Sequence, residues 1–197
     1  TNTKRWVPWA KHKGKPFRAI RNRENLSFSE ANNNAARLGR NEWICFLNND
    51  TILPDHGWLG MLVGTAQYKD WAATGPSSNA VLGIQQDCWN TEWPLTHEAK
   101  FLSGFCLVVR RDVFELIGGF DQHFFYGDED LDLSIRIRKA GWRIGVNRFV
   151  HVQHINQATL STITESPGQH YAETRQQLIG KWGEDTLRDL FIWPELT

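Results

Sequence analysis

Residues 44–51 read ICFLNNDT, an apolar run that passes directly into two amides and a carboxylate. A run such as Ile44–Leu47 is typical of a strand that is buried on both faces. The polar residues Asn48–Thr51 would then lie just beyond the carboxyl end of that strand, where open α/β sheets bind their ligands. This position suits a hard divalent cation that shares its coordination with substrate phosphates. It also suits a simple turn that caps the next helix, and this stretch alone leaves both interpretations open.

Strand-like and helix-like stretches alternate on both sides of this segment. Apolar periodicity and cap residues predict strands at 17–20, 43–47 and 102–109. They predict helices at 28–38, from 54 onward, at 112–117 and at 166–192, the last with a break at Gly183. The alternation predicts an α/β domain with a mixed, mostly parallel sheet flanked by helices. Residues 76–100 are irregular, which is typical of a functional loop.

The composition excludes several classes of protein. A chain of 197 residues suits one domain, and 22 basic against 22 acidic residues create no overall field that would favour a nucleic acid. The cysteines, at positions 45, 88 and 106, lack a Cys-x-x-Cys pair and predict free thiols rather than a disulfide framework or zinc site. No apolar run is long enough for a membrane span, and the first residues lack a signal peptide. We therefore expect a soluble, cytoplasmic protein.

A second cluster of chemistry-bearing residues lies at 126–138, YGDEDLDLSIRIR. Apolar residues alternate with polar ones, which favours a strand, whereas acids at the start and bases at the end favour a helix. We predict a helix, with an Asp132–Arg136 pair one turn apart. Four carboxylates exceed what a helix start needs, although they could simply suit its dipole. A nearby cation, or one acid with a raised pKa acting as a base, would relieve their repulsion.

Two histidines, His151 and His154, follow in RFVHVQH. Strand alternation would place them on opposite faces, so we do not expect them to bind one metal together. One of them could join Asp50 as a neutral imidazole, or it could be a hydrogen-bonded bystander.

Taken together, residues 25–62, residues 102–144 and His154 resemble the family-two nucleotide-sugar glycosyltransferases, which have the Rossmann-like GT-A fold. The resemblance covers 17–154 in matching order. It implies one partial glycosyltransferase domain over 1–197, with a core at 17–154 and a helical extension at 155–197. The family's first nucleotide-binding strands have no counterpart before residue 17, so we expect an N-terminally incomplete sheet.

The resemblance also implies a metal site and a base. Asn48 and Asp50 match the family's DxD-type motif, with Asp50 as the ligand of Mg²⁺ or Mn²⁺ beside the donor diphosphate. His154 matches the histidine that completes the metal site. Glu129 and Asp130 match the family's ED pair, in which the aspartate is the candidate catalytic base for the acceptor hydroxyl.

Further residues are assigned to the two substrates. Asn33, Asn48 and Gly104 match donor-side positions, and Phe105 matches the boundary with the acceptor. Aromatic side chains stack readily on sugar rings, and the candidates near the acceptor are Trp89, Trp93, Phe124 and Tyr126.

The expected function is metal-dependent, inverting transfer of a sugar from a nucleotide-diphosphate donor to a hydroxyl of a sugar or glycoconjugate, in polysaccharide synthesis. The expected partners are these two substrates and a second copy of the chain, because an incomplete sheet leaves apolar surface to cover. Two alternatives remain: an inactive sugar-binding or assembly module, and a metal-dependent hydrolase that uses the same acids.

Overall fold

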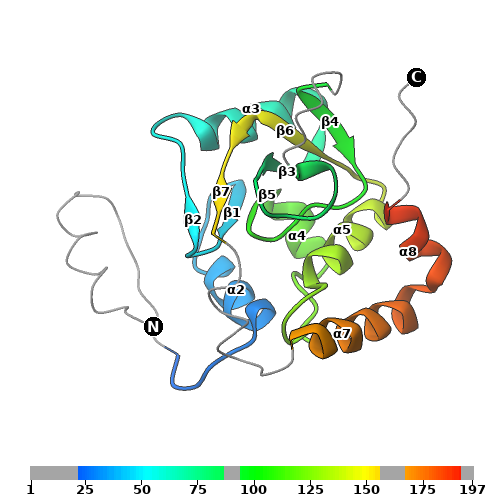
Figure 1. Ribbon diagram of the computed structural model, residues 1–197. Helices are drawn as coiled ribbons and strands as arrows, with labels where there is room; N and C mark the ends of the chain where they lie inside the picture. The colour runs from blue at the N-terminus through cyan, green and yellow to red at the C-terminus, as the bar shows by residue number, and fades with distance from the viewer. Residues whose placement is uncertain (1–21, 87–93, 156–166, 192–197) are drawn as a thin grey trace.

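The computed structural model describes residues 22–86, 94–155 and 167–191, with the side chains of 167–170 left out. Its centre is a five-stranded sheet with helices on both faces (Figure 1). The strands, in spatial order, are β1 (Trp43–Leu47), β5 (Cys106–Arg110), β3 (Trp71–Ser77), β6 (Arg143–His151) and β4 (Thr96–Ala99). A separate two-stranded ribbon pairs β2 (Thr51–Ile52) with β7 (Gln153–His154). The mixed sheet flanked by helices is thus confirmed.

The expectation of a mostly parallel sheet is wrong for the described strands. Only β3 and β6 run parallel, whereas β1–β5, β3–β5 and β4–β6 are antiparallel. Parallel neighbours need a crossover connection, usually a helix. The chain between β3 and β5 instead contains, in its described part, the 3₁₀ turn η1 (Gly83–Gln85) and the edge strand β4. It therefore brings β5 back in the opposite direction, between β1 and β3.

Strand β5 is buried on both faces, as its apolar sequence predicts. Leu107 and Val109 point into a core formed with α2, α4 and α5. Cys106 and Val108 point to the other face, where they join Leu62 of α3. This alternation follows from the period of two along a strand, and it places α3 on one side of the sheet and the other three helices on the opposite side.

Helix α2 (Phe28–Ala36) begins where the sequence predicts, because the Ser27 hydroxyl accepts a hydrogen bond from the Glu30 amide at 3.0 Å. Helix α4 (Arg111–Leu116) is followed by two glycines at positive φ. Helix α3 (Trp58–Lys69) begins later than expected, because Gly57 at φ +75° turns the chain immediately before it. Its apolar side chains are only partly buried, since Leu62 and Ala66 are fully buried but Met61 is 45% exposed.

Helix α5 (Glu129–Lys139) confirms the helix prediction for the acidic segment and explains its strand-like alternation. Leu133 and Ile137 pack into the core beneath the sheet. Leu131 and Ile135 pack against α7 and α8 instead. The helix is buried on two faces, so apolar residues occur at every second position rather than along one stripe.

Two helices at the end of the chain, α7 (Pro167–Trp182) and α8 (Glu184–Phe191), cover the outer face of α5 (Figure 1). They are separated at Gly183, whose φ of +82° requires the left-handed conformation, as the sequence predicts. Within the described residues, no helix is both long enough and apolar enough to cross a membrane.

Several expectations fall on residues outside the described part of the chain. These are the strand at 17–20, the missing nucleotide-binding strands before it, and the side chains of Trp89 and Trp93.

Candidate active site

The short ribbon of β2 and β7 brings Asp50 next to His154. Thr51 pairs with His154 across the ribbon, and the Ile155 amide donates to the Asp50 carbonyl at 2.9 Å. Asp50 Oδ1 and His154 Nε2 are consequently 3.3 Å apart, with both side chains almost buried. His151 lies elsewhere, with its Nδ1 3.5 Å from the Ser77 hydroxyl. Of the two candidate histidines, His154 is the one beside Asp50.

The contacts of His154 show which of its two ring nitrogens carries a proton. Its Nδ1 lies 3.1 Å from the Ala80 carbonyl, which can only accept, so Nδ1 carries a proton. In the neutral imidazole, Nε2 then directs a lone pair at Asp50 Oδ1, a buried oxygen that lacks a hydrogen-bond partner. A divalent cation, or a proton on Nε2, would relieve this opposition. The oxygen and nitrogen donors therefore fit a metal ion.

The acid pair Glu129–Asp130 occupies the first turn of α5. Asp130 Oδ2 accepts from the Gly104 amide at 2.8 Å, and its Oδ1 accepts from the Leu131 amide at 2.8 Å. The Glu129 carboxylate is buried and accepts from the Gly127 amide. Burial and the adjacent Asp130 charge raise the pKa of Glu129 to about 8, and burial also raises the pKa of Asp130. Higher pKa values make these carboxylates better proton acceptors.

Residues 103–105 link the Asp50–His154 pair to the acid pair. The Phe105 carbonyl accepts from the Asn48 amide at 2.8 Å, and the Phe105 ring stacks on His154 with centroids 5.1 Å apart. Gly104, the preceding residue, donates to Asp130. A Cβ at Gly104 would lie 3.4 Å from the Asp130 Cβ, which is an ordinary van der Waals distance, so the close approach does not itself require glycine.

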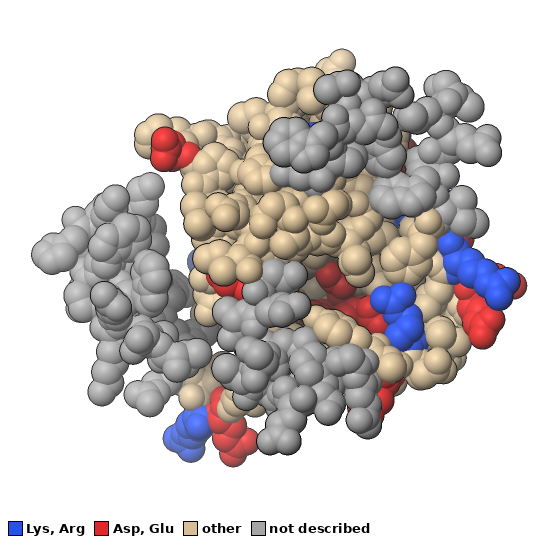
Figure 2. Space-filling model, viewed as in Figure 1, with Lys and Arg blue, Asp and Glu red and all other residues tan. Residues whose placement is uncertain are grey.

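Both ends open into one cleft of about 580 Å³. Figure 2 shows acidic side chains in a hollow near the centre of this face, with basic side chains beside them. The cleft contains eight of the expected site residues, namely Asn48, Asp50, Gly104, Phe105, Tyr126, Glu129, Asp130 and His154.

Two expected residues lie elsewhere. Asn33 is buried, and both of its side-chain groups bond to Phe120, whose carbonyl accepts at 2.8 Å and whose amide donates at 2.9 Å. The structure thus gives it a contact that holds the 120–124 loop rather than a place beside a donor. Phe124 is only 2% exposed and packs against α5 and α7, so it has no face available for a sugar ring.

Helix α7 contributes a cleft residue that the sequence analysis missed. Arg175 lines the cleft and forms a two-pronged ion pair with Asp128, at 2.9 Å and 3.0 Å. The sequence around Arg175 does not predict this contact, because Asp128 and Arg175 are far apart in the chain, with the whole of β6 between them. Only the packing of α7 against α5 brings them together.

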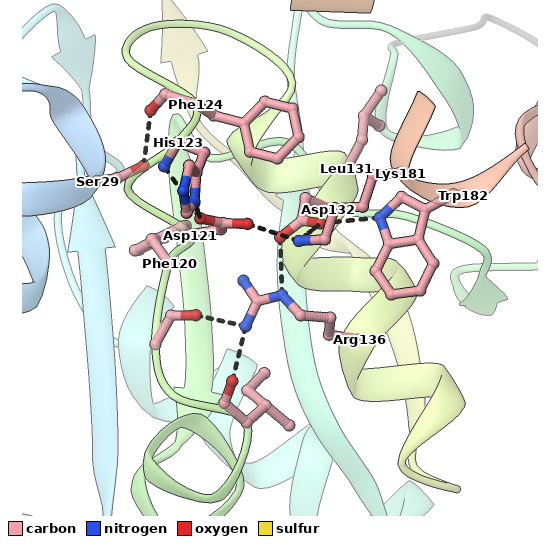
Figure 3. Close-up of polar contacts among 12 residues, drawn as sticks. Ser29, Phe120, Asp121, His123, Phe124, Leu131, Asp132, Arg136, Lys181 and Trp182 are labelled. Carbon is pink, nitrogen blue, oxygen red and sulfur yellow. Dashed lines mark hydrogen bonds and ion pairs between the residues drawn. The ribbon is translucent and has the colours of Figure 1, made fainter. Parts of the chain in front are cut away.

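A buried network behind the cleft holds α7 in place (Figure 3). The expected Asp132–Arg136 pair is confirmed at 2.7 Å, and Arg136 also donates to the carbonyls of Ile117 and Gly119. The other oxygen of Asp132 accepts from Lys181 at 2.6 Å and from the Trp182 indole at 2.8 Å.

Lys181 connects this network to the 120–124 loop. Its ammonium also contacts Asp121 at 2.6 Å. Burial alone would raise the pKa of Asp121, but hydrogen bonds from Lys181 and His123 hold it well below its ordinary value. The loop is held from its other side by α2, where the Ser29 hydroxyl donates to the Phe124 carbonyl.

The chain is similar to two curated bacterial proteins over part of their lengths. It is 29% identical over 145 residues to the O-antigen biosynthesis protein RfbC of Myxococcus xanthus, covering 60% of this chain and 11% of that protein. It is 42% identical over 72 residues to the N-acetylglucosaminyl-diphospho-decaprenol L-rhamnosyltransferase of Mycobacterium tuberculosis, covering 32% of this chain and 24% of that protein.

Two solved structures share the fold. The first is GalNAc-T7 with UDP, GalNAc and Mn²⁺, with a TM-score of 0.69 and 14% identity over 96% of this chain and 42% of that one. The second is the mannosyltransferase PcManGT from Pyrobaculum calidifontis in complex with GDP-Man and Mn²⁺, with a TM-score of 0.62 and 18% identity over 88% and 50%. Residues 2–101, just over half of the sequence, match glycosyl transferase family 2, and the chain belongs to this family.

Proposed function

We propose that this chain transfers a sugar from a nucleotide-diphosphate donor to a hydroxyl group, with metal dependence and with inversion at the anomeric carbon. The observation that carries the proposal is the unpartnered Asp50 Oδ1 facing His154 Nε2, in the same cleft as Asp130. One end of the cleft can hold a cation and a diphosphate, and the other end can accept a proton.

At the donor end, Asp50 and His154 would hold Mg²⁺ or Mn²⁺. The described residues contain no group of three or more His, Cys, Asp or Glu that could enclose a metal by itself. Two protein ligands leave coordination positions for diphosphate oxygens and water, which suits these cations. When bound, the metal would act as a Lewis acid that offsets charge on the departing diphosphate. Asn48 and Gly104 would line the donor side.

At the acceptor end, Asp130 would act as the general base. It takes the proton of the acceptor hydroxyl while the oxygen attacks the anomeric carbon. The bond from that carbon to the diphosphate oxygen breaks, and its electron pair leaves with the diphosphate. A single displacement from the opposite face inverts the anomeric centre. The two backbone N–H donors on Asp130 stabilise its charged form and orient it for this step.

The acceptor is a sugar or glycoconjugate in this proposal. Tyr126 lines the cleft beside the acid pair and offers aromatic surface for a sugar ring, whereas Phe105 is 2% exposed and its ring stacks on His154 instead. The names of the bacterial relatives, an O-antigen biosynthesis protein and a rhamnosyltransferase, support a role in assembling surface polysaccharide.

Calorimetry with UDP, dTDP and GDP, with and without Mn²⁺, tests the proposal on the wild type, Asp50→Ala and Asp130→Asn. We expect Mn²⁺-dependent binding of one nucleotide by the wild type and by Asp130→Asn, and its loss in Asp50→Ala. Transfer by Asp130→Asn should fall by about 10²- to 10⁴-fold. A folded wild type that binds no nucleotide would refute the donor site and favour the sugar-binding module.

A further inference from the structure

The residue before the acid pair has an unusual backbone conformation. Gly127 and Asp128 both have positive φ, +101° and +62°. Glycine adopts such values readily, whereas Asp128 does so at a cost in free energy. Asp128 occupies the N-cap position of α5, but its side chain makes no capping hydrogen bond there. Its carboxylate is committed to another contact, with Arg175.

The contact between Asp128 and Arg175 is two-pronged and largely shielded from water. Arg175 Nε and one terminal nitrogen each donate to a different oxygen of Asp128, whose side chain is 8% exposed. Such a fork fixes orientation as well as distance. Apart from His154, Arg175 is the one basic side chain among the described residues that line the cleft.

Helix α7 does not depend on Arg175 for its attachment. Leu178 is fully buried in the cluster with α5 and α8, and Lys181 and Trp182 both bind Asp132. Loss of the Arg175 side chain would therefore leave α7 in place and release only the turn at Asp128.

We propose that Arg175 is a positioning residue: its fork on Asp128 holds the turn that presents Glu129 and Asp130 to the cleft, and it offsets the Asp128 charge beside them. The inference rests on the proposed function, in which Asp130 is the base. A displaced turn would misplace that base, and small errors in position at a reacting centre reduce rates strongly.

The charges around Glu129 agree with this role. Burial raises its pKa most, and the charges of Asp130 and Asp128 raise it further. Tyr171 of α7 faces the same groups, since its pKa is raised by burial and then by Tyr126 and the three acids. The titratable and charged groups here are Tyr126, Asp128, Glu129, Asp130, Tyr171 and Arg175. Removing the Arg175 guanidinium would leave the Asp128 charge without its partner and make this set more negative.

The test compares Arg175→Gln, Arg175→Lys, Asp128→Asn and the double variant Asp128→Asn/Arg175→Gln. Steady-state transfer is measured with the nucleotide sugar that the calorimetry identifies. We expect kcat to fall by roughly 10- to 100-fold in both Arg175 variants, with little change in the donor KM, since lysine keeps the charge but loses the fork. The double variant should lose no more activity than either single variant, because all of them remove the same contact between Arg175 and Asp128.

A second readout does not depend on activity. The pKa of the Glu129 carboxyl, followed by ¹³C NMR, should rise in Arg175→Gln and return toward the wild-type value when Asp128→Asn is added. The control is Arg188→Gln on α8, where a 74% exposed arginine pairs with Glu184, and it should change neither kcat nor this pKa.

Three outcomes would overturn the inference: unchanged kcat and Glu129 pKa in Arg175→Gln, additive losses in the double variant, or full activity in Arg175→Lys. Absence of transfer in the wild type would instead count against the proposed function, and the NMR titration would still decide whether Arg175 governs the acid pair. Unchanged NMR signals of Leu178 and Trp182 in Arg175→Gln would confirm that α7 remains docked, whereas the urea midpoint is expected to fall because Asp128 loses its partner.

Discussion

Asp50 in the cleft and Asp132 behind it are both buried acids, but their partners differ. Asp132 is fully buried, and its two oxygens are shared among Arg136, Lys181 and Trp182. Asp50 is nearly as buried, yet its Oδ1 accepts no hydrogen bond and faces His154 Nε2 at 3.3 Å. Burial alone therefore does not distinguish the structural acid Asp132 from Asp50, which we propose as a metal ligand. The two acids differ in how completely their oxygens are paired.

The physical reason is the cost of taking a charge out of water. A buried carboxylate persists when cations and donors replace its lost hydration, as they do around Asp132. An oxygen without such partners is a cost to the fold, and a bound cation would remove it.

The largest effect is expected from Asp132→Asn. It would leave Arg136 without its charged partner and weaken the contact with Lys181, so we expect unfolding free energy to fall by about 3–5 kcal/mol. Urea unfolding measures this loss. Asp189→Asn is the matched control, because Asp189 pairs with Lys100 at the surface and should cost less than about 1 kcal/mol. Similar losses in the two variants would refute the contrast between buried and exposed partners.

The next effect concerns Mn²⁺. At 100 times its dissociation constant, Mn²⁺ should raise the unfolding free energy of the wild type by about 2.7 kcal/mol and leave Asp50→Ala unchanged. In EDTA, the variant should lie within about 1 kcal/mol of the wild type, because Asp50 Oδ1, the buried oxygen that faces His154, accepts no hydrogen bond that the variant would lose. Urea unfolding of both proteins, in EDTA and in Mn²⁺, checks this. A large loss in EDTA would show that Asp50 is a structural acid like Asp132.

The change in unfolding free energy with pH that comes from Glu129 is the smallest effect when it is counted per pH unit. Its pKa rises on folding from 4.5 to about 8, so the folded state binds more protons between these values. Its contribution to stability is full below pH 4.5 and is lost as pH rises through 8, by at most about 1.4 kcal/mol per pH unit. Glu129→Gln should flatten the dependence of the unfolding free energy on pH over this range, and at pH 9 the variant should be more stable than the wild type. A profile with the same slope in both proteins would assign the dependence to another group.

Local sequence predicts the elements of this chain better than their arrangement. The bounds of β1, the Ser27 cap, the helix at 129–139 and the break at Gly183 follow from residues that are close in sequence. The direction of β5 does not, because it depends on whether the preceding segment forms a crossover helix or folds into the edge strand β4. The alternation in α5 looked ambiguous because sequence alone does not show that α7 and α8 cover its outer face.

The site divides in the same way. The sequence by itself determined the acid pair, since Glu129 and Asp130 are neighbours at the start of a helix whose charge order is local. The family resemblance also predicted Asp50 as a metal ligand and His154 as the histidine that completes the same site. Only the tertiary structure showed that the β2–β7 ribbon is what brings these two together, that Asn33 binds the 120–124 loop, and that Arg175 reaches Asp128. Contacts between distant segments depend on which faces are buried together, and residue patterns within one segment do not contain that information.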